Sequence, residues 1–266
     1  MAQSTNNGAN IAYEGAALSK RAAFMALQVQ RKAEAQNHNG PAILDLGCGL
    51  GTVSFLLGSA GYKVTGVDLD SETIASCNAK NQAPNLTFVI GNAETLDLKQ
   101  EFDVVIASEV IEHVGHPELL LQTMNKHLAK EGIGIVSIPN GYCLWELVVS
   151  RFIQKGKLVS WLYKSPKLHK ALTGGDSPFY SKNVFCFHSN FFSFGKLKKL
   201  LAQNGFRILL VQHSDLGILP EWSWLRFLKR VECKLADYVP HFLAGGWLLV
   251  IAGDNHIGMT SSEGNE

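Results

Sequence analysis

Three alternating glycines directly after a short apolar run constrain this chain more than any other feature of its sequence. Residues 42–46 read Ala-Ile-Leu-Asp-Leu, a run that suits a short buried strand. Gly47, Gly49 and Gly51 follow, and glycines let the backbone turn tightly against a ligand. Residues 52–60 can then open a helix. The segment predicts a strand, a glycine turn and a helix that together form a nucleotide-type cofactor site.

A carboxylate ends the next apolar run. Residues 63–67 are Lys-Val-Thr-Gly-Val, and Asp68 follows them. In a doubly wound sheet, an acid in this place reaches the ribose hydroxyls of a cofactor that lies over the first turn. The glycines lack the Gly-x-Gly-x-x-Gly spacing of dinucleotide sites, and Asp45 would repel a pyrophosphate but attract an ammonium or sulfonium group. S-adenosylmethionine carries both cations and is therefore the expected cofactor.

Several segments carry a family resemblance. Residues 44–51, Leu-Asp-Leu-Gly-Cys-Gly-Leu-Gly, resemble motif I of the class I S-adenosylmethionine-dependent methyltransferases. Residues 91–96 are similar to the family's adenine-binding segment, with Asn92 where an acid is more usual. Residues 103–114 resemble the fourth-strand motif in the branch that includes ubiquinone-biosynthesis O-methyltransferases. The resemblance covers residues 40–138 closely and the remainder loosely.

The resemblance also implies which residues hold the cofactor. Asp68 would bind the ribose, and the amide oxygen of Asn92 can accept a hydrogen bond from the adenine amino group. The end of the fourth strand, at Ser108, lies beside the transferable methyl group in the family. The complete expected set is Asp45, Gly47, Gly49, Asp68, Leu69, Asn92, Ala93, Glu94 and Ser108.

Glu109, Glu112 and His113 form the candidate catalytic cluster. A neutral hydroxyl is a poor nucleophile, so methyl transfer to oxygen benefits from a general base or from a metal that lowers the acceptor pKa. The spacing would place the three side chains on one face of a helical turn. In one reading His113 is the base, and Glu112 or Glu109 orients it. In a second reading these three residues and His188 bind a divalent metal such as magnesium. In a third reading their roles are structural.

The expected fold is α/β. The resemblance implies a doubly wound, seven-stranded and mostly parallel sheet, the Rossmann-like methyltransferase fold. We expect strands at residues 42–46, 63–67, 86–90, 103–107, 133–138 and 246–252. A helix within 16–34 would cap the cofactor edge, and a helical insertion at 140–190 would roof the active site. One domain is expected over 11–253, with disordered tails at 1–10 and 254–266.

Composition limits the partners. The net charge of +1 lacks the excess of positive charge that is typical of nucleic-acid-binding proteins, and it argues against nucleic acid as a partner. Five cysteines without a Cys-x-x-Cys pair predict a reduced, cytoplasmic protein. Residues 216–239 are amphipathic and leave two readings open. We favour a helix that covers the lid, and the alternative is a membrane-surface helix with peripheral membrane contact.

Together these features predict an O-methyltransferase that acts on a hydroxyl of a small aromatic or lipid-like acceptor. Aromatic residues of the insertion motivate the acceptor class, although packing onto the sheet explains them equally well. They are Trp145, Trp161, Tyr163, Phe179 and Tyr180. Rival enzyme readings are N- or C-methylation of a small molecule and metal-dependent methylation of an RNA 2′-hydroxyl. The non-enzyme alternative is a cofactor-binding protein that has lost its catalytic activity and acts by binding a partner. The sequence specifies no oligomeric state.

Overall fold

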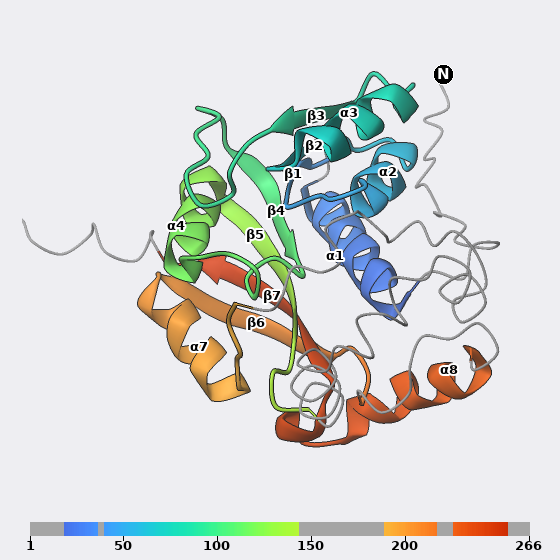
Figure 1. The fold of residues 1–266 in the computed structure, drawn as a ribbon, viewed down its shortest axis with the longest axis vertical. Helices are drawn as coiled ribbons and strands as arrows, with labels where there is room; N and C mark the ends of the chain where they lie inside the picture. Colours follow the sequence, from blue (N-terminus) through green and yellow to red (C-terminus); the bar gives the residue numbers. More distant parts are fainter. Residues whose placement is uncertain (1–18, 37–39, 144–188, 217–225, 255–266) are drawn as a thin grey trace, which may run out of the picture.

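The computed structural model describes residues 19–36, 40–143, 189–216 and 226–254. Within these ranges seven strands form one sheet in the order β3-β2-β1-β4-β5-β7-β6 (Figure 1). The strands are β1 (Ala42–Leu46), β2 (Lys63–Asp68), β3 (Leu86–Ile90), β4 (Phe102–Ser108), β5 (Leu128–Pro139), β6 (Phe206–His213) and β7 (Gly246–Gly253). Both pairings of β7 are antiparallel, and every other pairing is parallel. The predicted sheet is confirmed.

The strands follow the apolar runs of the sequence, because strands buried on both faces read as continuous apolar segments. β1 and β3 have the expected bounds. β5 begins earlier than the expected residue 133, since Leu128 already pairs with Phe102 across a register shift in the β4–β5 ladder. Such an irregularity has no apolar signature in the sequence, so the start of β5 was predicted wrongly.

Helices cover both faces of the sheet (Figure 1). One face carries α1 (Lys20–Gln36), α2 (Thr52–Ser59) and α3 (Ser71–Lys80), and the other carries α4 (Pro117–His127) and α7 (Phe194–Gln203). Neighbouring residues of β1 point to opposite faces of the sheet. Ile43 packs in the hydrophobic core beneath α1, α2 and α3, and Leu44 packs in the core beneath α4 and α7. Because β1 to β5 run parallel, their carboxyl ends lie along one common edge of the sheet.

Helix α1 crosses a whole face of the sheet rather than only capping the cofactor edge. Its last turn is fixed at the amino-terminal side of the strands, where Gln36 Nε2 donates to Asp103 Oδ1 at 2.6 Å. Its first turn reaches the carboxyl edge, where Arg21 Nη1 lies 3.2 Å from Glu109 Oε2. The expected cap is therefore limited to the start of the helix, because the buried side of α1 packs along the sheet.

β6 ends and β7 begins at the carboxyl edge, and the described chain between them forms α8 (Arg226–Leu235), the short helix η3 (Ala236–Tyr238) and the short helix η4 (His241–Leu243). Asn140 follows β5 directly, and its Nδ2 donates to the carbonyl oxygens of Phe242 at 3.2 Å and Ala244 at 2.8 Å. The side chain thus fastens η4 beside the end of β5. The expected tails, apart from Asp254, and most of the insertion at 140–190 lie outside the described residues.

The close packing of the glycine turn can be tested by adding one methyl group. Gly47 has φ of 67°, and a Cβ atom there would lie 2.5 Å from Cγ2 of Val110. We expect Gly47→Ala to lower the free energy of unfolding by about 3 kcal/mol, since the left-handed backbone costs about 1–2 kcal/mol and overpacking about 1–3 kcal/mol.

Gly49→Ala is the matched control. Gly49 has φ of 52°, but nothing lies within 4 Å of the position that its new methyl group would take, so only the backbone cost of about 1–2 kcal/mol applies. Denaturant unfolding of both variants without ligand measures the difference. Equal losses would contradict the contact between Gly47 and Val110.

Candidate functional site

The turn between β1 and α2 follows a left-handed path at each of its glycines. Gly47, Gly49 and Gly51 have φ of 67°, 52° and 75°. Val110 fills the space beside Gly47, and the ring of Phe55 fills the space beside Gly51. Space beside Gly49 is open, because no atom lies within 4 Å of the position that a Cβ would take. The first and third glycines are therefore required by packing, and the middle one leaves a surface on which a ligand can lie.

Asp68 ends β2 and connects the glycine turn to the next loop. Its Oδ2 accepts from the backbone N–H of Gly49 at 2.8 Å, and its Oδ1 accepts from the N–H of Asp70 at 3.0 Å. Each carboxylate oxygen keeps a second lone pair, so the side chain can still accept hydrogen bonds from ligand hydroxyls. Leu69 follows and is 69% exposed, which offers apolar surface beside the carboxylate.

Asp45 lies behind the turn, not on its surface. The residue is 1% exposed, and its Oδ2 accepts a hydrogen bond from Ser54 Oγ on α2 at 2.6 Å. Burial raises the pKa of Asp45 to about 6, with a further rise from the charge of Asp68, while hydrogen bonds from Ser54 lower it. We therefore interpret Asp45 as a group that acts on a cation at the turn through its electric field and not by direct contact.

Asn92 and Glu94 shape the segment that follows β3. Oδ1 of Asn92 accepts from the backbone N–H of Glu94 at 2.9 Å. Oε1 of Glu94 accepts from the backbone N–H of His116, directly before α4, at 2.5 Å. Ala93 packs against the core that α4 shares with the sheet. The carboxylate of Glu94 thus positions the start of α4, and the amide oxygen of Asn92 keeps one lone pair for a ligand.

The structure separates Glu109 from Glu112 and His113. Glu109 has φ of 56°, and its Oε1 accepts from Ser137 Oγ at 2.9 Å while its Oε2 pairs with Arg21. The expected common helical face is wrong, because a left-handed residue cannot belong to a right-handed helical turn. Glu109 faces α1 and β5 instead.

Glu112 and His113 remain neighbours. Glu112 is 1% exposed, and its Oε1 lies 3.8 Å from Nε2 of His113, whose side chain is 32% exposed. The carbonyl oxygen of Glu112 accepts from the backbone N–H groups of Ser189 at 2.8 Å and Asn190 at 3.0 Å. The chain that follows position 188 thus runs along this turn. His188 itself lies outside the described residues.

The expected metal ligands do not form a set in the part of the chain that the structure describes. There, no group of three or more His, Cys, Asp or Glu side chains is placed to hold a metal ion. The carboxylate of Glu109 is held by Ser137 and Arg21, away from Glu112. Glu109, Glu112 and His113 therefore do not fit a magnesium site together.

A row of polar contacts that the sequence did not reveal crosses the carboxyl edge. Ser108 Oγ at the end of β4 lies 3.1 Å from Ser137 Oγ on β5, which in turn donates to Glu109. Arg21 on α1 completes the row. Ser137 interrupts the apolar run 133–138, a signal that could have marked it. Arg21 carried no such signal, because its contact depends on how α1 crosses the sheet.

An apolar cavity of about 380 Å³ opens at the carboxyl end of β5. Its walls include Tyr142, Phe194, His241, Phe242 and Trp247. The rings of Phe194 and His241 stack with their centroids 4.1 Å apart. The Phe194 ring also packs against the Trp247 ring in a tilted arrangement, with a centroid distance of 5.4 Å. The sequence alone does not reveal this cavity, because its walls come from segments that are far apart in the chain.

Sequence comparison relates the chain to methyltransferases. A family model described as methyltransferase domain matches residues 17–211. Ubiquinone biosynthesis O-methyltransferase from Rickettsia akari (strain Hartford) is 36% identical over 100 residues, which are 37% of this chain and 40% of that relative. The enzyme of the same name from Caulobacter sp. (strain K31) is 37% identical over 105 residues, 38% of this chain and 42% of that relative. The match thus spans about two fifths of these relatives' length.

Solved structures share the fold. Magnesium protoporphyrin IX methyltransferase from Synechocystis PCC 6803 with bound SAH superposes with a TM-score of 0.53 at 16% identity, covering 86% of this chain and 82% of that one. A TehB-like SAM-dependent methyltransferase from Corynebacterium glutamicum gives 0.51 at 17% identity and covers 92% of both chains. These similarities concern the arrangement of the elements described above.

The raised pKa of Asp45 predicts a pH-dependent stability. Because the folded pKa of about 6 exceeds the ordinary value of 3.8, the folded state binds the proton more tightly than the unfolded state. The resulting stabilisation of about 3 kcal/mol is present at about pH 3, below the unfolded pKa, and is lost by about pH 7, as the pH rises through the folded pKa. Asp45→Asn removes this titration. We expect its free energy of unfolding, relative to the parent protein, to increase by about 3 kcal/mol between these pH values.

Urea unfolding across this pH range is the measurement. Ser54→Ala serves as the control, because it keeps the buried carboxyl group and removes a hydrogen bond that lowers its pKa. This control retains the pH dependence. A difference between parent and Asp45→Asn that stays constant with pH would show that the carboxyl group is not buried as described.

Proposed function

This chain belongs to the methyltransferase domain family, and on that premise we propose that it is an S-adenosylmethionine-dependent O-methyltransferase acting on a small aromatic or lipid-like acceptor. The match to the family model confirms the methyltransferase family that the sequence motifs predicted. The names of the curated relatives support oxygen as the acceptor atom. The fold shared with a methyltransferase that binds SAH supports the cofactor.

The arrangement of Gly49 and Asp68 is the observation that carries the proposal. The open surface at Gly49 lies next to a carboxylate that can accept hydrogen bonds from the two ribose hydroxyls. Leu69, the residue that follows Asp68, is exposed and provides apolar surface for an adenine ring. The charges of Asp45 and Asp68 favour a cationic ligand over a pyrophosphate. When bound, S-adenosylmethionine supplies an electrophilic methyl group on a positively charged sulfur.

His113 is the candidate general base for oxygen transfer. The acceptor hydroxyl must be positioned and must lose its proton, and a partly exposed imidazole can take that proton at neutral pH. The buried carboxylate of Glu112, 3.8 Å from Nε2, stabilises the imidazolium ion that forms. Glu109 has a supporting role in this proposal, because Arg21 and Ser137 hold its carboxylate.

The apolar cavity supports the proposed acceptor class. Its volume of about 380 Å³ lies within the range of small-ligand sites, which is about 300–1,000 Å³. Asn140 and Trp247 place it beside the end of β5 and the start of β7, on the same edge of the sheet as Ser108. Aromatic walls favour a ring or an apolar chain over a strongly polar acceptor.

Cofactor binding is tested at Asp68. We expect Asp68→Ala to weaken S-adenosylmethionine binding by about 100-fold or more, because hydrogen bonds to a charged group are each worth about 1.5–3 kcal/mol. Isothermal titration calorimetry measures the change. Asp97→Ala is the control, because Asp97 pairs with Lys99 and Lys126 outside the proposed site. Unchanged affinity in a folded Asp68→Ala protein would contradict the cofactor site.

Catalysis is tested at His113. We expect His113→Gln to lower kcat by about 100-fold to 10,000-fold, the usual contribution of a general base, and to leave S-adenosylmethionine affinity unchanged. Formation of S-adenosylhomocysteine with a panel of catechols and hydroquinones gives kcat, and mass spectrometry identifies the methylated atom. Equal turnover by parent and variant would remove His113 as the base. A parent protein that binds the cofactor but methylates no acceptor would favour the alternative of a cofactor-binding protein without catalytic activity.

A further inference from the structure

Helix α8 turns its polar residues toward the protein. The side chains of Lys229 and Glu232 are 15% and 4% exposed, and their Nζ and Oε2 atoms lie 3.0 Å apart. Lys229 Nζ also lies 2.7 Å from Oδ2 of Asp215, which follows β6 closely. An amphipathic helix on a globular protein ordinarily buries its apolar side. Helix α8 does the opposite, because its inner side is polar and is fixed by ion pairs.

The apolar residues of α8 point to solvent. Phe227, Leu228, Val231 and Leu235 are 74%, 50%, 40% and 52% exposed. Their helical spacing places them together along one side, which we term the apolar face of α8. Surface of this kind usually marks an interaction site.

The charges beside the apolar face are basic. Arg230 and Lys234 are exposed, whereas the acidic residue of this helix, Glu232, is buried against Lys229. Helices with an apolar side and flanking lysine or arginine bind the interface of anionic bilayers. A symmetric contact with a second copy would instead bring the same basic residues of both chains together, which costs energy. Charge complementarity therefore favours an anionic lipid surface.

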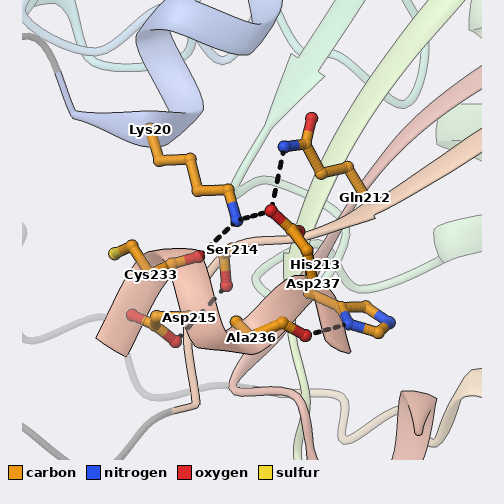
Figure 2. Close-up of polar contacts among 8 residues, drawn as sticks. All are labelled: Lys20, Gln212, His213, Ser214, Asp215, Cys233, Ala236 and Asp237. Atoms are coloured by element: carbon orange, nitrogen blue, oxygen red, sulfur yellow. Dashed lines mark hydrogen bonds and ion pairs between the residues drawn. The ribbon is translucent and has the colours of Figure 1, made fainter. Parts of the chain in front are cut away.

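Contacts on the inner side fasten α8 firmly to the domain. Figure 2 shows Lys20 of α1 reaching the end of α8, where its Nζ donates to the carbonyl oxygen of Cys233 at 2.6 Å and pairs with Asp237 at 2.8 Å. His213 Nδ1 donates to the carbonyl oxygen of Ala236 at 2.6 Å (Figure 2). These bonds hold the inner side in place, so the outward direction of the apolar face is built into the fold.

We propose that α8 docks this protein on an anionic lipid surface, with its apolar face in the interface and with Arg230 and Lys234 against the lipid headgroups. This revises the preference for a lid that the sequence suggested. The proposal stands apart from methyl transfer, because it requires neither cofactor nor acceptor. Among the described helices, none has the length and apolarity needed to cross a bilayer.

Sedimentation of the full chain with vesicles tests the proposal. We expect binding to vesicles of mixed phosphatidylcholine and phosphatidylglycerol, and much weaker binding to phosphatidylcholine alone. The double variant Phe227→Ser with Val231→Ser should lower the partition coefficient by about tenfold or more, because it removes two apolar side chains from the interface. Arg230→Gln and Lys234→Gln should each lower it by about fivefold on the anionic vesicles only.

Leu209→Ser is the matched control, because Leu209 is an apolar residue of β6 with 49% exposure away from α8. It should bind vesicles like the parent. Absence of binding to anionic vesicles, or equal binding by the double variant, would overturn the proposal. A dimer in light scattering that the double variant abolishes would overturn it in favour of a second copy. A large drop in Tm of the double variant without vesicle binding by the parent would show that this chain covers the face itself.

Discussion

The backbone of the first turn approaches its neighbours more closely than a side chain would permit, and the whole site depends on this approach. Gly47 lies against Val110 beyond the end of β4, and the N–H of Gly49 donates to Asp68 at the end of β2. These two contacts bring the ends of β1, β2 and β4 into one rigid edge. A ligand then meets polar groups that are already in position, so that binding loses less conformational entropy in ordering them.

Much of this edge could be predicted from the sequence, because its signals are local. Buried parallel strands read as apolar runs, and alternating glycines mark a turn that needs a left-handed backbone. The position of Asp68 followed from its place at the end of the second run. Contacts between distant segments were not predictable: Arg21 meets Glu109 only because α1 crosses the sheet, and the cavity walls converge from separate elements. The left-handed conformation of Glu109 likewise has no signature in its residue type.

Glu109 shows how the fold sustains an unfavourable local geometry. A left-handed backbone at a residue with a side chain costs about 1–2 kcal/mol, and such residues gather at functional sites. Here the carboxylate receives a hydrogen bond from Ser137 and an ion pair from Arg21, while the backbone N–H donates to the carbonyl oxygen of Ser137. The reversal redirects the chain after β4, so that Glu112 becomes buried and His113 remains partly open. The three residues of the cluster therefore lie in different environments.

Phe242 belongs to two environments at once, since it is 71% exposed and also forms part of the cavity wall. The cavity therefore has an apolar rim. For a molecule with a long hydrocarbon tail, the slow and costly event is passage through water, in which it is scarcely soluble. The apolar rim lowers that cost, because part of the tail can rest on Phe242 while the remainder lies in the cavity. For the lipid-like acceptor class proposed above, this rim would therefore ease entry of the tail into the cavity.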